Sequence, residues 1–220
     1  MALAPLVLFD LDGTLVDTAP DLRAALDRLL ARQGRPAVDP AAFRATVSRG
    51  GSAMLTLAFP ELDPERRLEF LTPFLALYEE DIARHSSLFE GMDAVLDAIE
   101  RESCWGVVTN KPERLARKLL EAMGLAPRCA VLVGGDTLPT RKPDPAPLLE
   151  ACRRLGAGPG SAIYVGDDRR DVEAARAAHM RSVGAAWGYF AADERIEDWG
   201  ADAIARVPHD LLEGHLELRP

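Results

Sequence analysis

The 220-residue chain contains only three cysteines, Cys104, Cys129 and Cys152, and no C-x-x-C pair. An odd number of widely spaced cysteines argues against a disulfide framework and favours free thiols in a reducing cytoplasm. The four histidines show neither H-x-H nor H-x-x-x-H spacing, so a zinc site is not expected. Cysteine and histidine chemistry therefore gives no candidate site.

Long apolar runs and excess positive charge are also missing. No apolar run approaches the roughly 20 residues that cross a bilayer, so we expect no membrane partner. The net charge of −9 argues against general nucleic-acid binding, which needs a basic surface. The mixture of 48% hydrophobic and 28% charged residues is typical of a globular protein. The acidic composition is compatible with a monomer or a homodimer.

Short apolar runs alternate with helical patterns over most of the chain. The apolar runs are Leu6–Phe9, Trp105–Val108, Val131–Val133, Ile163–Val165 and Ser182–Ala185. The helical patterns between them are Glu113–Met123, Pro145–Leu155 and Asp168–Ala178. Strands that alternate with helices of this length predict an α/β fold with a doubly wound, Rossmann-like parallel sheet.

The segment 17–88 interrupts this alternation, because it has helical patterns and no convincing strand. One apolar stripe consists of Leu22, Ala25, Leu26, Leu29 and Leu30. A second stripe consists of Leu68, Leu71, Leu75, Tyr78 and Ile82. We interpret 17–88 as an all-helical cap domain inserted after the first strand, with 1–16 and 89–220 forming the α/β catalytic core.

Polar residues follow the predicted strands, where open α/β sheets bind ligands. Asp10 and Asp12 follow the first strand, Thr109 the second, and Asp167 the fourth. Lys142 precedes a predicted helix. These turns should meet at one edge of the sheet, where their carboxylates would repel one another unless a cation lay between them. Carboxylates without histidine or cysteine suit Mg²⁺, and we predict Asp10, Asp12 and Asp167 as its ligands.

The same residues can divide the work of phosphoryl transfer. Asp10, at the strand end, can attack phosphorus as a nucleophile, and Asp12 can act as the general acid and base. The hydroxyl of Thr109 and the turn behind it can hold phosphate oxygens, while Lys142 supplies positive charge in the transition state.

Four ordered motifs carry a resemblance to a known superfamily. They are Asp10-Leu11-Asp12-Gly13-Thr14, Thr109, Lys142, and Gly166-Asp167-Asp168 with Asp171. This set resembles the haloacid dehalogenase-like hydrolases over nearly the whole chain, including a helical cap directly after the first motif. The resemblance implies a Mg²⁺-dependent phosphatase that forms an aspartyl-phosphate and acts on a small phosphorylated metabolite.

Two branches of that superfamily are similar in finer detail. Thr109-Asn110-Lys111-Pro112 is similar to the phosphoglycolate phosphatase form of the second motif, and adds Asn110 as a substrate-binding candidate. The stretches 85–91, 105–108 and 199–202 resemble N-acetylmuramic acid 6-phosphate phosphatases. By resemblance to family caps, Arg49, Gly50 and Gly51 form a loop that contacts the substrate.

Several alternatives remain open. Asp168 and Asp171 can either cap the helix that follows them or contribute to the surroundings of the metal. A phosphosugar mutase of the β-phosphoglucomutase type would use the same motifs, and glucose 1-phosphate distinguishes it by yielding glucose 6-phosphate instead of free phosphate. A catalytically silent binding or regulatory protein is the alternative from another class.

Metal dependence is the first testable prediction. We expect the protein to release phosphate from a generic aryl phosphate when Mg²⁺ is present, because the carboxylates need a cation before an anionic substrate can approach. EDTA should abolish this release, and excess Mg²⁺ should restore it, in a colorimetric phosphate assay. Undiminished activity in EDTA would contradict the predicted magnesium site.

Overall fold

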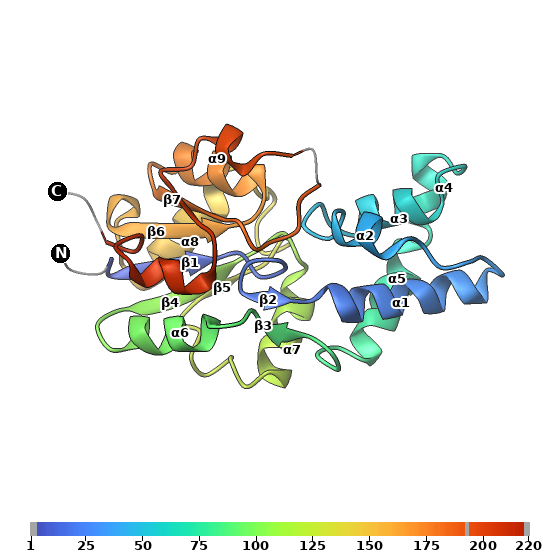
Figure 1. Cartoon of the computed structure of the whole chain (residues 1–220), viewed down its shortest axis with the longest axis horizontal. Coiled ribbons are helices and arrows are strands. Elements are labelled where there is room, and N and C mark those ends of the chain that lie inside the picture. The colour runs from blue at the N-terminus through green and yellow to red at the C-terminus, as the bar shows by residue number, and fades with distance from the viewer. Residues whose placement is uncertain (1–3, 192–193, 218–220) are drawn as a thin grey trace.

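The computed structural model describes residues 4–191 and 194–217 and consists of an α/β core and a smaller helical part (Figure 1). Six strands form the main sheet: β1 (Leu6–Phe9), β4 (Cys104–Val108), β5 (Leu132–Val133), β6 (Ala162–Gly166), β7 (Arg181–Ala185) and β8 (Ala203–Ala205). Their order is β5-β4-β1-β6-β7-β8, and every neighbouring pair is parallel. This order confirms the predicted doubly wound α/β fold, because the chain proceeds outward from β1 in both directions.

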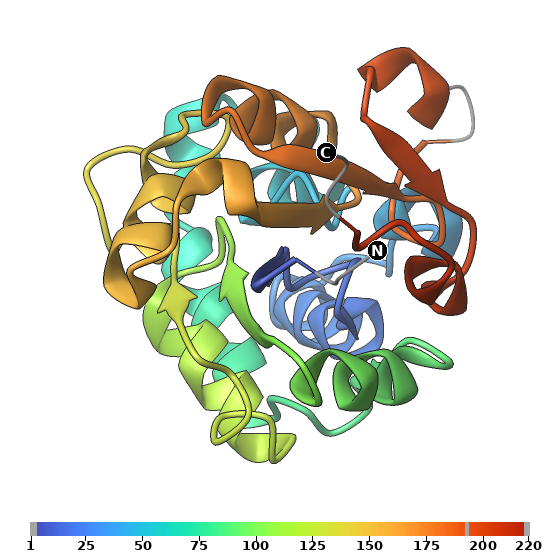
Figure 2. The same ribbon diagram turned by 90° about the vertical axis from the view of Figure 1, so that its left-hand side faces the viewer.

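Helices cover both faces of this sheet (Figure 2). The core helices are α6 (Met92–Glu100), α7 (Glu113–Ala122), α8 (Ala146–Leu155) and α9 (Arg169–Ala177). Successive residues of β1 point to opposite faces, as strand geometry requires. Val7 and Phe9 pack with α6 and α7, whereas Leu6 and Leu8 pack with α8 and α9. A strand buried on both faces is apolar throughout, which is why the continuous run in the sequence predicted it.

The helical part contains five α-helices within 19–80. They are α1 (Ala19–Arg32), α2 (Pro40–Arg44), α3 (Gly51–Ala58), α4 (Pro64–Leu68) and α5 (Leu71–Glu80). Helix α1 packs along α5, and the helices enclose an apolar cluster of their own. We call this part the cap. None of the helices in the described ranges is both long and apolar enough to span a bilayer.

The two predicted apolar stripes of the cap differ in outcome. The first is confirmed, because all five of its residues are buried on α1. The second is wrong as a single stripe, because α4 ends at Leu68, whose side chain is 53% exposed. Of the predicted residues, Tyr78 is buried on α5, together with Phe74 and Leu77, which were not part of the stripe. Leu71 and Leu75 are only partly buried, and both line a cavity described below.

Two short strands correct the expectation that 17–88 contains none. Val16–Asp17 (β2) and Ser87–Leu88 (β3) pair antiparallel where the chain enters and leaves the cap. Periodicity could not predict them, because two residues per strand give no pattern. The division at 16/17 and 88/89 stays a prediction, and residues 1–3, 192–193 and 218–220 of the proposed core lie outside the described ranges. The described residues also include three 3₁₀-helices: η1 (Pro159–Ser161), η2 (Ile196–Trp199) and η3 (Pro208–Leu212).

Asp21, in the first turn of α1, connects the segment that enters the cap to the segment that leaves it. Its carboxylate is 4% exposed and accepts hydrogen bonds from the backbone N–H groups of His85 and Ser86, and from Ser86 Oγ, at 2.6–3.1 Å. A buried carboxylate with several donors is stabilised by charge-assisted hydrogen bonds. This contact ties the start of the cap to the segment that returns to the core.

Replacing Asp21 should therefore loosen this junction. Asp21→Ala leaves two backbone donors without their acceptor, and we expect it to lower the free energy of unfolding by about 2–4 kcal/mol. Urea unfolding followed by circular dichroism measures the loss. The control Asp198→Ala removes an exposed carboxylate and should change stability by less than about 0.5 kcal/mol. Equal effects from both variants would contradict the role of Asp21.

Candidate active site

The candidate site lies where the order of the sheet reverses. Strands β1 and β6 are neighbours, yet β4 and β7 continue from them in opposite directions. Asp10 follows β1 and Asp167 follows β6, and Asp10 N donates a hydrogen bond to the Val165 carbonyl at 2.9 Å. The carboxyl ends of strands at such a switch point form a ligand-binding crevice in open α/β sheets.

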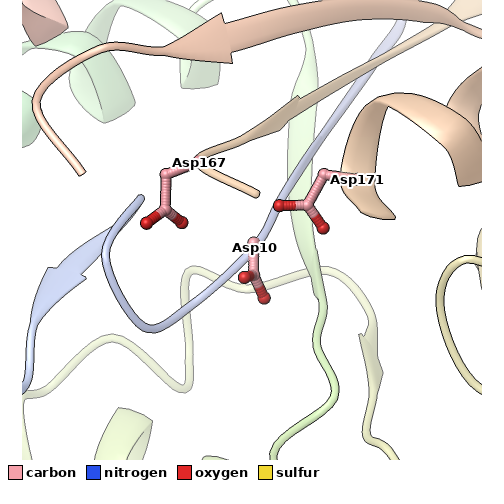
Figure 3. A group of neighbouring side chains, drawn as sticks. All are labelled: Asp10, Asp167 and Asp171. Atoms are coloured by element: carbon pink, nitrogen blue, oxygen red, sulfur yellow. The ribbon is translucent and has the colours of Figure 1, made fainter. Parts of the chain in front are cut away.

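Three carboxylates meet at this position, from Asp10, Asp167 and Asp171 (Figure 3). One oxygen from each lies within 4.8 Å of the others. Their exposed fractions are only 6%, 0% and 1%. Asp171 comes from the first turn of α9, so two segments of the chain, the end of β1 and the connection from β6 to α9, create the cluster. So many buried negative charges at this spacing require compensation.

Lys142 is the ammonium group at this cluster. Its Nζ lies 2.9 Å from Asp10 Oδ1 and 2.7 Å from Asp171 Oδ1, and it is also 2.7 Å from Tyr164 Oη. Burial alone would lower the pKa of Lys142, but Asp10 and Asp171 outweigh burial and raise it. One ammonium against three carboxylates leaves two negative charges without a counter-charge when all groups are ionised.

Burial and mutual repulsion raise the pKa values of two carboxyl groups in the cluster. Burial, reinforced by the charges of Asp10 and Asp171, raises the pKa of Asp167 well above its usual range. Burial also raises the pKa of Asp171 to about 7, although Lys142 opposes the shift. Asp10 Oδ1 is buried and has no hydrogen-bond donor of suitable geometry among the described residues, despite its ion pair with Lys142.

These features fit a hard divalent cation. The donor set consists of carboxylate oxygens only, which suits Mg²⁺, and the excess of negative charge over the single ammonium of Lys142 favours a cation. The residues able to hold it are Asp10, Asp167 and Asp171. Asp12, which we also predict as a ligand, is not part of this carboxylate cluster, and its metal role stays a prediction.

The carboxylate of Asp12 has other partners. Lys111 Nζ donates to its two oxygens at 2.9 and 3.2 Å, and Thr18 Oγ1 donates to Oδ1 at 2.6 Å. Lys111 is buried, and its ammonium lies 4.4 Å from the ring centroid of Tyr78 in the cap. Asp12 is therefore held at a fixed orientation, with part of its carboxylate at the cavity.

Asp167 is fixed by donors from three segments. Thr14 Oγ1 donates to Oδ1 at 2.8 Å, while Tyr189 N and the cap's Ser48 Oγ donate to Oδ2 at 2.8 and 2.7 Å. The close approach also explains Gly13, whose φ is +90°. A Cβ at Gly13 would lie 2.2 Å from Asp167 Oδ2, so no other residue fits there without displacing Asp167.

A cavity of about 210 Å³ opens between the cap and these residues. The core contributes Asp10, Asp12, Thr109 and Asn110 to its lining. The cap contributes the loop at Ser48 to Ser52. The structure thus brings these candidates of the core and the loop of the cap to the same space.

Thr109 and Asn110 form the wall next to Asp12. The hydroxyl of Thr109 accepts a hydrogen bond from Lys111 N at 3.2 Å, which fixes the turn after β4. Asn110 Nδ2 donates to the Lys142 carbonyl at 3.0 Å and links two of the motifs. Asn110 Oδ1 is buried and lacks a hydrogen-bond partner in the described part of the chain.

The cap loop, residues 48–52, lines the cavity and also contacts the core. Gly50 has φ +83° and directly precedes α3, which begins at Gly51. Arg49 pairs with Glu194 at 3.1 Å, so its charge is already balanced, and its side chain is 53% exposed. Arg170 donates to the Ser48 carbonyl at 2.6 Å and therefore anchors the loop to α9.

The prediction that Asp168 and Asp171 cap a helix is confirmed. Asp168 Oδ1 accepts from Arg170 N at 2.9 Å, and Asp171 Oδ2 accepts from Asp168 N at 3.0 Å, which together form a capping box on α9. Asp171 also belongs to the carboxylate cluster. Its two oxygens thus serve the helix and the site simultaneously.

Sequence reasoning missed the contacts of Ser48, Lys111 and Arg170. Lys111 could have been found, because it directly follows the motif residue Asn110 at a strand end. Ser48 contacts Asp167 across 119 positions of sequence, and no local pattern indicates that contact. Arg170 pairs with Asp168 at 2.9 Å and also donates to the Ser48 carbonyl of the cap, a contact that no local pattern indicates.

The raised pKa of Asp171 predicts a pH-dependent stability of the metal-free protein. Folded Asp171 keeps its proton up to about pH 7, whereas an unfolded aspartate loses it near pH 4. Between these values the folded state binds more protons, so this group lowers the free energy of unfolding as pH rises. In EDTA, we expect a lower Tm at pH 8 than at pH 5, and Mg²⁺ should raise Tm more at pH 8.

The variant Asp171→Asn isolates this contribution. It removes the titrating carboxyl, so the difference in Tm between pH 5 and pH 8 should become smaller than in the unmodified protein. Asp198→Asn, which alters an exposed carboxyl, should leave that difference unchanged. An unaltered difference in Asp171→Asn would show that Asp171 does not titrate in this range.

Comparison with known proteins places the chain in a family. Residues 7–185 match the family model described as "Haloacid dehalogenase-like hydrolase". A phosphoglycolate phosphatase of Xanthomonas campestris pv. campestris (strain 8004) is 47% identical over 208 residues, which cover 94% of each chain. An N-acetylmuramic acid 6-phosphate phosphatase of Pseudomonas putida (strain KT2440) is 45% identical over 212 residues, which cover 93% of each.

A solved structure agrees with these sequence matches. The crystal structure of a predicted phosphoglycolate phosphatase from Haemophilus somnus superposes with a TM-score of 0.87 at 29% identity, and the alignment covers 97% of this chain and 98% of that one. The match therefore includes the cap as well as the core. With the family model spanning all four motifs, the chain belongs to the haloacid dehalogenase-like hydrolases.

Proposed function

We propose that this protein is a Mg²⁺-dependent phosphatase that hydrolyses a small phosphate monoester through an aspartyl-phosphate intermediate. One observation carries the proposal. The nucleophile candidate Asp10 lies in a buried carboxylate cluster with Lys142, at the floor of a cavity that Asp12 and Thr109 also line. The similarity to proteins named phosphoglycolate phosphatase and N-acetylmuramic acid 6-phosphate phosphatase supports it.

In the first half of the proposed reaction, an Asp10 oxygen attacks the phosphorus atom. A new Asp10 O–P bond forms while the P–O bond to the leaving group breaks. Asp12, in its protonated form, donates that proton to the departing oxygen, so the leaving group departs as a neutral alcohol. Lys111 and Thr18 hold the Asp12 carboxylate in place for this transfer.

In the second half, water attacks the phosphorus of the aspartyl-phosphate. Asp12, now a carboxylate, accepts the proton of the attacking water, and the Asp10 O–P bond breaks. Inorganic phosphate leaves, and Asp10 and Asp12 return to their initial states. The fixed orientation of Asp12 is therefore used twice in each cycle.

Mg²⁺, held by Asp10, Asp167 and Asp171, would offset their negative charge and that of the phosphoryl group. Asp12 remains a proposed contributor to the same ion. Lys142 holds Asp10 in position through its ion pair and adds a second positive charge beside the reacting oxygen. Thr109 and Asn110, which has an unpartnered Oδ1, are the proposed contacts for phosphate oxygens and substrate.

The cap provides the proposed contacts to the leaving group. Arg49, Gly50 and Gly51 line the cavity on the side opposite the core motifs, and the loop is anchored to the core by Ser48 and Arg170. The candidate substrates are 2-phosphoglycolate and N-acetylmuramic acid 6-phosphate. A cytoplasmic location and a monomeric or homodimeric state stay predictions.

The role of Asp10 can be tested by Asp10→Asn. An amide is a poor nucleophile, so we expect kcat on an aryl phosphate to fall by about a thousandfold or more. Acid quenching during steady-state turnover should trap phosphate on the unmodified protein and none on Asp10→Asn. Asp198→Asn is the matched control and should retain normal turnover.

Two outcomes would contradict the assignment. Full activity in Asp10→Asn would exclude it as the nucleophile. A normal rate in the unmodified protein with phosphate trapped on a different residue would place the covalent step elsewhere. Circular dichroism on each variant separates loss of chemistry from loss of folding.

A further inference from the structure

The cations that line the cavity differ in whether they have an anionic partner. Arg49 pairs with Glu194, Lys111 with Asp12 and Arg170 with Asp168, at 2.9–3.1 Å. Arg141 also lines the cavity, and within the described ranges it has no ion pair or side-chain hydrogen bond. Arg141 is therefore the cavity cation whose charge is available to a ligand.

Arg141 is placed to contact the leaving group of a substrate. It directly precedes Lys142, which contacts Asp10. Its own carbonyl accepts a hydrogen bond from Asp144 N at 3.0 Å, so its backbone is fixed by a turn. The side chain is exposed at the cavity. A guanidinium binds a carboxylate through two parallel hydrogen bonds and gives both charge and geometric selectivity.

Much of the lining that the cap contributes to the cavity is apolar. The cap contributes six apolar residues to the lining: Leu22, Val47, Met54, Leu71, Phe74 and Leu75. Leu71 and Leu75 are partly buried on α5, where they pack against the apolar cluster of the cap and also line this cavity. Covering apolar surface contributes about 25 cal/mol per Å², so a leaving group with apolar parts gains affinity here.

We infer that the substrate is a phosphate monoester whose leaving group carries both a carboxylate, bound by Arg141, and apolar groups, bound against Leu71 and Leu75. This inference rests on the proposed phosphatase function and narrows its substrate class. The glycolate group has a carboxylate but only one methylene, so it leaves the apolar wall uncovered. A neutral sugar phosphate leaves Arg141 without a partner.

Four substrates separate these contributions. N-Acetylmuramic acid 6-phosphate has the carboxylate and apolar methyl groups. N-Acetylglucosamine 6-phosphate has the same sugar and acetyl group but lacks the lactyl group with its carboxylate and methyl, and 2-phosphoglycolate has the carboxylate without the apolar groups. p-Nitrophenyl phosphate reports on the chemistry alone. We expect kcat/KM for the first to exceed each of the next two by about tenfold or more.

Variants of Arg141 test the carboxylate contact. Arg141→Gln should lower the ratio of kcat/KM for N-acetylmuramic acid 6-phosphate over N-acetylglucosamine 6-phosphate by about tenfold, the effect of losing one charged hydrogen-bonding partner. Arg141→Lys keeps the charge and should restore part of the ratio. Arg101→Gln changes an exposed arginine at the end of α6 and should leave the ratio unaltered.

Variants of α5 test the apolar wall. Leu75→Gln replaces an apolar side chain with a polar one and should reduce kcat/KM for N-acetylmuramic acid 6-phosphate more than for 2-phosphoglycolate. Leu68→Gln, at an exposed cap position outside this cavity, is the matched control and should alter neither value. Thermal unfolding of both variants identifies any loss caused by misfolding.

The outcomes distinguish this inference from the proposed function. Hydrolysis of p-nitrophenyl phosphate without preference among the other three substrates would overturn the inference and leave the phosphatase function intact. A preference for 2-phosphoglycolate, or a ratio unaffected by Arg141→Gln, would also overturn it. Failure to hydrolyse any of the four substrates with Mg²⁺ would instead contradict the proposed function.

Discussion

The mutual repulsion of three buried carboxylates is the constraint on which the site depends. Asp10, Asp167 and Asp171 are held within 4.8 Å of one another with one ammonium group, that of Lys142, in contact. An unpaired buried charge is costly, so the surrounding fold must hold the cluster together against its own electrostatics. In the proposed function, the same imbalance favours a bound cation and, with the cation in place, an anionic phosphoryl group.

The sheet and the cap share the task of holding these groups. Adjacent parallel strands β1 and β6 fix Asp10 and Asp167 at the switch point, and the capping box of α9 fixes Asp171. Ser48 reaches Asp167 from the cap. The cap therefore does more than cover the cavity, because its loop supplies one of the hydrogen bonds that orient the cluster.

Different parts of the cavity are proposed to bind the phosphate and the leaving group. Its floor is polar and can be assigned to phosphate chemistry from the motif residues alone. Apolar residues of α5 also line it, as does Arg141, which has no ion pair with any residue that the structure describes. We therefore propose that selectivity for a leaving group depends on residues outside the four motifs, which is consistent with relatives of different named activities sharing 45–47% identity with this chain.

The sequence by itself determined the α/β core and the identity of the chemical groups. Strands buried on both faces are apolar throughout, and polar motif residues at their ends mark Asp10, Thr109 and Asp167 without any coordinates. Only the tertiary structure decided which groups touch. It directed the Asp12 carboxylate to Lys111, added Asp171 to the cluster, and turned Leu71 and Leu75 toward the cavity. Local periodicity records which residues are apolar or charged, but contacts between distant segments depend on how the elements pack.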